Sequence, residues 1–560
     1  MRIAAKIAAL GLITALGACA SASRQAPGGQ SSEFGTYLSA RFAASQHNLK
    51  DASVYYRAAY AADPTNKDLL ALAFFFATSS GDIDNAARLS EEVVAAQPDD
   101  RAARLTLAVV AMKHRDFAGA RQQIALSAKG PFTSLTVGLV DGWAAAGMGD
   151  KAAAIADLTA LRAQGGVDAL AMFHLALLAE FVGDAKIADA SYQSLLNSGT
   201  TPRVIDAYGR FLERSGRTAD ATAFYTKFSQ DGSLKLVTDA GLKRIKDGKK
   251  PDPLVMRAED GAAEALFGIA ASLTDQASVD VSILYLRLAL YLRPGLDLGA
   301  VLLADRLEGL QKYEDAIAVY GTVENGSPYR RMAEVEIALD EARLQRNDAA
   351  IAHLRQLTAD DPTDVEAWTA LGDTYRSTSK FAEAAAAYDH AVSLRGDSKA
   401  SDWPLYFARA VAEQGALNWN AAEVDLKKAL LLSPDEPTLL NYLGYTWVDQ
   451  NRNIPEALAM LEKAHSLRPT DGYIADSVGW AYYKLGRYAD AAKALQTAVE
   501  LVPGDSTIND HLGDAYWRVG RKLDAQFQWN HALAFGPADA DKAIIEKKLK
   551  DGLDAGGKPN

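Results

Sequence analysis

Small and apolar residues recur along much of the chain with a period of about 34 positions. The period is clearest in DVEAWTALGDTYRSTSKFAEAAAAYDHAVSLRG, DGYIADSVGWAYYKLGRYADAAKALQTAVELVP and DSTINDHLGDAYWRVGRKLDAQFQWNHALAFGP. When each repeat is numbered from the residue after the first aspartate of these stretches, a glycine stands at the eighth position: Gly372, Gly479 and Gly513, with Gly444 at the equivalent position of another repeat. Alanines recur further on, with one large residue between each two: Ala384, Tyr388 and Ala391; Ala457, Leu461 and Ala464; Ala491, Leu495 and Ala498; Ala525, Trp529 and Ala532.

The spacing of these residues predicts two helices in every repeat. Positions 4, 7, 8 and 11 share one face of a helix, and positions 20, 24 and 27 share one face of a second helix. Glycine and alanine at positions 8, 20 and 27 let two backbones approach closely, and the large residues fill the space beside them. Each repeat should therefore fold as an antiparallel pair of helices.

Prolines mark the ends of these pairs, because proline cannot continue a helix. Pro434, Pro469, Pro503 and Pro537 are separated by 35, 34 and 34 residues. The pattern is highly specific in 361–537, good in 34–131 and degenerate from 136 to 360. It predicts an all-α chain of roughly 13 helix pairs.

The pattern resembles the tetratricopeptide repeat (TPR), whose period is also 34 residues. The resemblance implies an α-solenoid, a right-handed superhelix whose concave wall is lined by the first helix of each pair. We expect an N-terminal superhelix over 34–240, a C-terminal superhelix over 254–537, and a capping helix with a tail over 538–560. Between the superhelices, the segment GLKRIKDGKKPDP (241–253) is rich in Lys, Arg and Pro and predicts an exposed linker or hinge. A basic contact patch is the alternative.

Composition narrows the classes of function. The chain of 560 residues has a net charge of −12 and no long basic run, which disfavours binding to nucleic acid. It contains a single cysteine, Cys19, so neither an intrachain disulfide framework nor a zinc site with several thiolates can form.

The first residues, MRIAAKIAALGLITALGAC, have the pattern of a signal peptide over 1–18. Arg2 and Lys6 precede or flank a run of mostly apolar residues that is too short to span a membrane. The ending Leu16-Gly17-Ala18-Cys19 resembles the lipobox of bacterial lipoproteins, which implies lipidation of Cys19 and a flexible tether over 19–33. By the same resemblance, Ala20 suggests the periplasmic face of the outer membrane. Cleavage by an ordinary signal peptidase, giving a soluble periplasmic protein, is the alternative.

Catalytic signatures are not apparent in the sequence. None of the eight histidines lies in an HExxH helix, and no GxSxG elbow or GxxxxGK phosphate loop occurs. We therefore expect no enzyme, and no cofactor, metal or small-molecule substrate. The alternative is a catalytic site assembled from scattered positions.

The resemblance also selects residues for a partner-binding wall, since positions 2, 5, 9, 12 and 13 of a TPR commonly face the concave side. In the last three repeats these are Asn441, Tyr445 and Asp449; Tyr473, Asp476, Trp480, Tyr483 and Lys484; and Thr507, Asp510, Asp514, Trp517 and Arg518. Aromatic residues with polar neighbours suit a protein partner. The alternative is that the aromatic side chains pack against neighbouring repeats. Aspartates at three positions argue against a basic clamp for peptide carboxylates.

The last three repeats, with LGYTWVD, DSVGWAYYKLGRYADA and HLGDAYWRVGRKLDA, resemble a narrower group of outer-membrane lipoproteins. Members of that group are adaptors that hold a periplasmic carboxy-terminal processing protease and bring it substrates, including cell-wall hydrolases. The resemblance implies a non-enzymatic scaffold. The alternative is a structural factor in the assembly or secretion machinery of the outer membrane or of polysaccharides.

Overall fold

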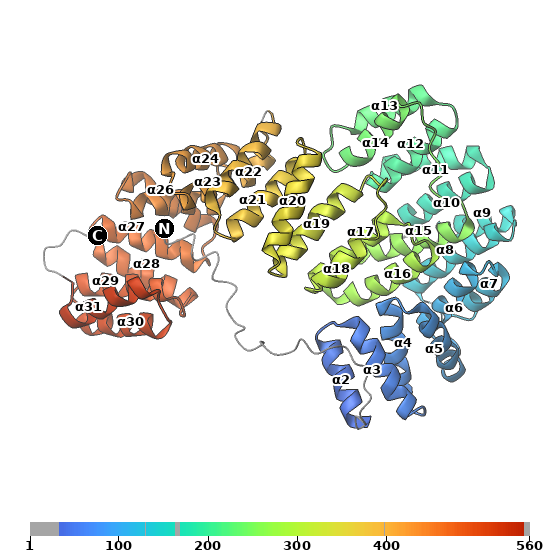
Figure 1. Cartoon of the computed structure of the whole chain (residues 1–560), viewed down its shortest axis with the longest axis horizontal. Helices are drawn as coiled ribbons and strands as arrows, with labels where there is room; N and C mark the ends of the chain where they lie inside the picture. Colours follow the sequence, from blue (N-terminus) through green and yellow to red (C-terminus); the bar gives the residue numbers. More distant parts are fainter. Residues whose placement is uncertain (1–32, 129, 163–167, 397, 554–560) are drawn as a thin grey trace. The chain divides into compact units, whose positions relative to one another are not determined.

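The computed structural model describes residues 33–128, 130–162, 168–396 and 398–553, and most of them lie in helices (Figure 1). This part of the chain holds 30 α-helices and two short 3-10 helices, and none of its residues belongs to a β-strand. Successive helices form 14 pairs, with α14 and α31 unpaired, so the predicted all-α solenoid of roughly 13 pairs is confirmed. The predicted signal peptide, Cys19 and the tether up to residue 32 lie outside the described residues.

Packing divides the chain into two compact units, with the division between Ala350 and Ile351 inside α20. We call them the N-terminal unit and the C-terminal unit. Helices that begin in the N-terminal unit are α2(Glu33–Ser45), α3(Leu49–Ala62), α4(Lys67–Ser80), α5(Ile83–Ala96), α6(Arg101–Lys113), α7(Phe117–Ala125), α8(Pro131–Gly147), α9(Lys151–Arg162), α10(Asp168–Val182), α11(Ala185–Ser198), α12(Pro202–Arg214), α13(Thr218–Phe228), α14(Lys235–Lys246), α15(Ala258–Ser272), α16(Val279–Leu292), α17(Asp297–Gly309), α18(Tyr313–Tyr320), α19(Arg330–Arg343) and α20(Asn347–Asp360).

The C-terminal unit continues with α21(Val365–Ser377), α22(Phe381–Leu394), α23(Trp403–Gly415), α24(Trp419–Leu432), α25(Pro437–Asp449), α26(Ile454–Leu467), α27(Gly472–Lys484), α28(Tyr488–Leu501), α29(Ser506–Arg518), α30(Lys522–Ala534) and α31(Asp539–Asp551). The 3-10 helices are η2(Gln276–Ser278) and η3(Ala400–Asp402).

Glycines at the eighth repeat position allow the close approach that the sequence predicted. A Cβ atom on Gly479 would lie 2.5 Å from Cγ of Leu495, and one on Gly513 would lie 2.5 Å from the Trp529 ring. Leu495 and Trp529 are fully buried. The pairs α27–α28 and α29–α30 are therefore held by a large side chain seated against a bare backbone.

The N-terminal unit folds back on itself. Helix α15 packs against α8 and α10, and α16 packs against α4 and α6, all of which are first helices of earlier pairs (Figure 1). The fully buried ring of Trp143 on α8 touches Gly261 of α15, where a Cβ would lie 2.2 Å from it. Further across this contact, Lys113 Nζ donates to the Leu292 carbonyl at 3.1 Å. The inner face of these pairs is thus covered by the chain's own α15 and α16.

The segment 241–253 differs from the predicted exposed linker in its first half. Residues 241–246 complete α14, and Gly241 lies under the ring of Tyr225. Arg244 Nη2 is 2.6 Å from Glu213 Oε1, and the side chain of Glu213 is only 4% exposed. A basic residue that the sequence placed in solvent is therefore paired in the packed interior. The whole segment lies within the N-terminal unit, and its role as a hinge or contact patch stays a prediction.

The last described helix, α31, packs against α30 through the buried side chain of Ile545. It lies within the range 538–560 that the sequence predicted as a capping helix with a tail. Residues 554–560 are outside the described part.

Candidate functional site

Three helices carry the predicted partner-binding residues, and we call their inner face the C-terminal wall: α25, α27 and α29. Helices α27 and α29 begin in the same way, because Asp471 and Asp505 each accept hydrogen bonds from two backbone N–H groups of the first turn. Equal starting points put equivalent repeat positions on the same face of each helix. This is why residues 34 positions apart come together on the wall.

Aromatic rings stack across the boundary between α27 and α29. The Trp480 ring lies parallel to Tyr483, with centroids 4.8 Å apart, and to His511, with centroids 4.0 Å apart. His511 Nδ1 is 2.9 Å from Asp476 Oδ1, and both side chains are buried. Lys484 Nζ lies 5.1 Å from the centre of the Trp480 ring. We call Trp480, Tyr483 and His511 the aromatic stack.

The predicted residues of the stack differ in burial. Tyr483 and Asp476 are buried between neighbouring repeats, and a role of either side chain in partner binding stays a prediction. Trp480 and Lys484 are half-buried and keep part of their surface at the wall. His511 was not among the predicted site residues, because its repeat position is outside the set that commonly faces the concave side.

A charged cluster closes the far end of the wall. Lys548 Nζ of α31 lies 2.8 Å from Asp510 Oδ1 and 2.8 Å from Asp514 Oδ1. Asp514 Oδ1 also accepts a hydrogen bond of 3.0 Å from Trp529 Nε1. Burial raises the pKa of Asp514 to about 6, although the ammonium group of Lys548 acts in the opposite direction. These two aspartates are therefore occupied by the chain's own lysine, which no repeat pattern indicates.

Two other predicted residues of α29 also lie close to packed neighbours. A Cβ on Gly552 would lie 2.1 Å from the Trp517 ring, so the chain after α31 touches this half-buried side chain. Arg518 Nε donates to the Tyr483 hydroxyl at 3.3 Å. The Thr507 backbone N–H donates to Asp505 at the helix start.

The accessible part of the wall lies on α25 and α27. Tyr473 is 50% exposed, and Asp449 is exposed at the end of α25. Tyr445 is 9% exposed and belongs to the packed interior. The half-buried Asn441 carries an amide oxygen, Oδ1, that is buried and has no hydrogen-bond partner among the described residues. The surface available to a partner therefore combines a projecting tyrosine and the edge of the aromatic stack.

In the described part of the chain, no three His, Cys, Asp or Glu side chains are grouped so that they could hold a metal ion. Among the described helices, none combines the length and apolar content needed to cross a bilayer. The geometry of the wall suits docking, and partner binding by its residues stays a prediction.

Comparisons with known proteins identify the repeats. Family models of the tetratricopeptide repeat match residues 335–400 and 77–132, and a model described as TPR repeat matches residues 479–520. TPR repeat-containing protein PA4667 of Pseudomonas aeruginosa is 36% identical over 94 residues, which cover 17% of this chain and 16% of that protein.

Cytochrome c-type biogenesis protein CycH of Rhizobium meliloti is 33% identical over 121 residues, or 22% of this chain and 31% of that protein. The chain therefore spans less than a third of the length of either curated relative. One chain in the crystal structure of the APC/C hetero-tetramer Cut9-Hcn1 has 15% identity and a TM-score of 0.38, with 94% of this chain and 97% of that chain covered. The protein thus contains tetratricopeptide repeats, and its described part is an all-α solenoid of helix pairs.

Proposed function

We propose that this protein is a non-enzymatic scaffold that captures a protein partner on the C-terminal wall. The observation that carries the proposal is the accessible surface around Tyr473 and Trp480. Aromatic side chains at the centre of an interface contribute much of the binding energy. In the N-terminal unit, by contrast, α15 and α16 already cover the corresponding face of α4 to α10.

In this proposal the protein acts at the periplasmic face of the outer membrane, where lipidated Cys19 anchors it. The first described helix, α2, supports a position next to lipid. Its side chains Phe34, Leu38 and Phe42, spaced four residues apart on one helical face, are 70%, 50% and 69% exposed. An apolar stripe directly after a lipid anchor can insert into the boundary between head groups and acyl chains.

The proposed partner is a periplasmic carboxy-terminal processing protease or a cell-wall hydrolase. The predicted flexible tether over residues 19–33 would keep the protein in a thin shell next to the membrane. Confinement raises the effective concentration of the partner without any new contact. Such a scaffold needs no chemistry of its own.

A second function is favoured by the similarity to the cytochrome c-type biogenesis protein CycH. An assembly factor would use the same wall to hold a component of membrane or secretion machinery. The two candidates differ in the partner and not in the site. Co-purification with a pore-forming or maturation component, in place of a protease or hydrolase, would favour assembly.

Affinity purification from native membranes tests the proposal. We expect Tyr473→Ala combined with Trp480→Ala to remove the partner recovered with the wild-type protein. The matched control is Leu523→Ala on α30, because Leu523 is 83% exposed on a second helix, away from the first helices that form the wall. Recovery of the same partner by a folded double variant would contradict binding at the C-terminal wall.

A further inference from the structure

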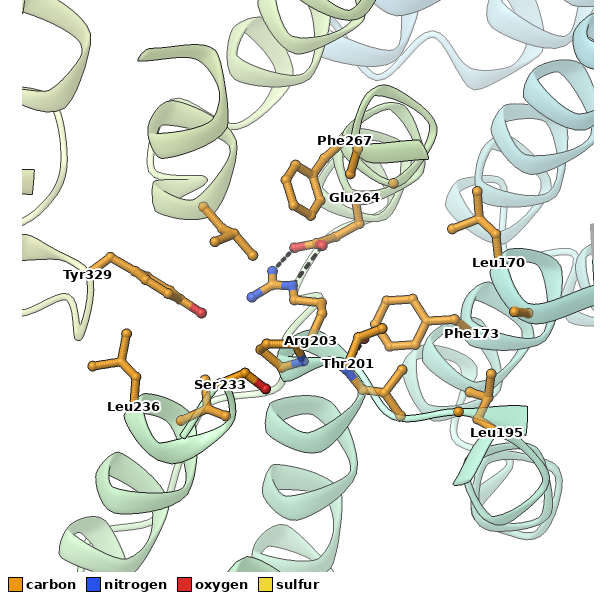
Figure 2. Close-up of a pocket in the computed structure, with 18 residues that line it drawn as sticks. Leu170, Phe173, Leu195, Thr201, Arg203, Ser233, Leu236, Glu264, Phe267 and Tyr329 are labelled. Carbon is orange, nitrogen blue, oxygen red and sulfur yellow. Dashed lines mark hydrogen bonds and ion pairs between the residues drawn. The ribbon is translucent and has the colours of Figure 1, made fainter. Parts of the chain in front are cut away.

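A cavity of about 460 Å³ lies inside the N-terminal unit (Figure 2). Residues of α10, α11, α12, α14, α15 and α17, together with Tyr329, line it. Thr201, Pro202 and Ala271 at its rim are exposed, whereas the carboxylate of Glu264 deep inside it is fully buried. Its volume is in the range of sites that bind small molecules, which is roughly 300–1,000 Å³.

The walls of the cavity are mainly apolar. Its large apolar side chains include Leu170, Phe173, Leu195, Leu236, Val237 and Phe267. Leu236 is 42% exposed at the solvent side. Polar side chains in the lining are few: Thr201, Arg203, Ser233, Glu264 and Tyr329. A ligand that fills this space must therefore be mostly hydrocarbon.

Arg203 and Glu264 line the polar end of the cavity, and Arg293, Arg210 and Asp206 belong to the same group of charged side chains outside the lining. Arg203 holds Glu264 with two nitrogens, Nη2 to Oε1 and Nε to Oε2, the latter at 3.1 Å. Arg293 Nη1 also reaches Glu264 Oε1, at 3.2 Å. Arg210 Nε pairs with Asp206 Oδ1 at 2.7 Å. Three guanidinium groups thus stand against two carboxylates, which leaves one positive charge uncompensated in this group.

Two polar atoms converge on the space in front of this charge. The third guanidinium nitrogen of Arg203, Nη1, points toward the hydroxyl of Tyr329 (Figure 2). Its distance to Asp206 Oδ2 is 3.9 Å, which is too long for a hydrogen bond. No hydrogen bond joins the Tyr329 hydroxyl to another side chain in the described part of the chain. Both atoms can therefore donate to an acidic group that enters the cavity.

We infer that the cavity binds a single-chain amphiphile with an acidic head group, that is, a ligand of the fatty-acid class. The alkyl chain lies between the apolar walls, and the carboxylate accepts hydrogen bonds from Arg203 Nη1 and the Tyr329 hydroxyl. This site is distinct from the C-terminal wall and goes beyond the scaffold function, so either proposal can fail without the other.

An apolar peptide with a free carboxylate fits the cavity less well. Every peptide unit brings an N–H and a C=O group, and each needs a hydrogen-bond partner once it is removed from water. Apart from the charged end, the lining offers only the side chains of Thr201 and Ser233. An alkyl chain has no groups that need a hydrogen bond, so the apolar walls favour an alkyl chain over a peptide.

Calorimetric titration of the full chain with dodecanoate tests the inference. The protein carries Cys19→Ser, so that no lipid of its own competes, and the pH is 7.5, where dodecanoate is ionised. We expect saturable binding at one site, with dodecanoate bound about tenfold more tightly than dodecanol because of its charge. Tyr329→Phe should weaken the binding of dodecanoate several-fold and leave that of dodecanol unchanged.

A variant that fills the cavity locates the site. Ala271→Trp places a large ring at the exposed rim of α15 and should weaken the binding of dodecanoate at least tenfold. Ala58→Trp, at an exposed position of α3 outside the cavity, should bind as the wild type does. Lack of saturable binding, or equal binding by Ala271→Trp, would overturn the site. Equal affinity for dodecanoate and dodecanol would overturn the head group, and tighter binding of an apolar tripeptide would overturn the ligand class.

Discussion

Two buried rings in the N-terminal unit, Trp143 and His174, share one hydrogen bond. Trp143 Nε1 donates to His174 Nδ1 at 3.1 Å, which places the histidine proton on Nε2. Nε2 is buried and has no hydrogen-bond partner among the described residues. Burial lowers the pKa of His174 from 6.5 to about 3, because no neighbouring group compensates the charge of an imidazolium there. The interior of α8 and α10 therefore requires a neutral histidine.

This requirement makes the N-terminal unit sensitive to acid. The folded pKa of His174 is lower than the unfolded pKa, so its contribution to stability is complete above pH 6.5 and is lost as the pH falls toward 3. At pH 5 we expect a loss of about 2 kcal/mol in the free energy of unfolding. His174→Asn keeps an acceptor for Trp143 and should show a smaller loss. Urea unfolding at pH 7.5 and pH 5 measures both, and equal losses would show that another group is responsible.

Helix pairs in the C-terminal unit depend on the absence of a side chain at one position. Glycine in the middle of a helix normally lowers its stability by about 1 kcal/mol relative to alanine. At Gly479 the contact with Leu495 reverses this preference, because a methyl group would overlap a fully buried side chain. The close contact between α27 and α28 therefore stabilises the fold by more than the helix propensity of glycine destabilises it.

Replacement by alanine tests this balance. Gly479→Ala should reduce the free energy of unfolding by about 1–3 kcal/mol through overpacking. Gly309→Ala is the control, since Gly309 is the last residue of α17 and a Cβ there would meet nothing within 4 Å. We expect the control to be neutral or stabilising. Thermal denaturation distinguishes the two variants, and equal behaviour would contradict the packing role of Gly479.

The closing helix α31 depends on a buried ion pair. Lys548 is 13% exposed and Asp514 is 7% exposed, so removing the lysine would leave a buried carboxylate without an oppositely charged partner. Lys548→Met should cost about 3–5 kcal/mol and detach α31, which hydrogen exchange of 539–551 would show. Adding Asp514→Asn should recover much of the loss, because the amide oxygen can still accept from Trp529. Additive effects of the two changes would contradict a direct interaction between them.

Acidification should also raise the stability of Lys548→Met relative to the wild-type protein. The pKa of Asp514 is raised by burial, so its proton is held more tightly in the folded state than in the unfolded chain. Its contribution to stability therefore grows as the pH falls through about 6 toward 3.8. The stability that Lys548→Met lacks relative to the wild-type protein should accordingly shrink between pH 7 and pH 5, as hydrogen exchange of 539–551 in both proteins would show. A difference that grows over this range would contradict the assignment.

Contacts within one repeat could be predicted from the sequence, whereas contacts between helix pairs far apart in the chain could not. Gly479 and Leu495 lie within one repeat, so their spacing repeats along the chain and can be recognised. Trp143 and Gly261 belong to different helix pairs far apart in the chain, and no periodic signal links them. The cavity in the N-terminal unit likewise collects side chains from six helices. A repeat pattern describes how neighbours stack, and it says nothing about a chain that returns onto its own inner face.

The proposed attachment to the membrane belongs to the scale of the whole molecule. Cys19→Ser should release most of the protein into the soluble fraction, because the stripe of Phe34, Leu38 and Phe42 alone buries too little apolar surface for stable anchoring. Adding serine at these three positions should release the remainder. The control is Leu417→Ser, at an exposed position in the C-terminal unit, 80% exposed. Cys19→Ser protein that stays in the membrane fraction would show that lipidation does not hold it.

The central claim is that the C-terminal wall contacts a protein partner, and site-specific photo-cross-linking in intact cells tests it most directly. A photoreactive phenylalanine analogue replaces Tyr473 on the wall in one strain and Leu523 on α30 in another. The account predicts one dominant protein adduct from position 473 and none of that size from position 523. The same adduct from both positions, or no adduct from 473, would contradict it.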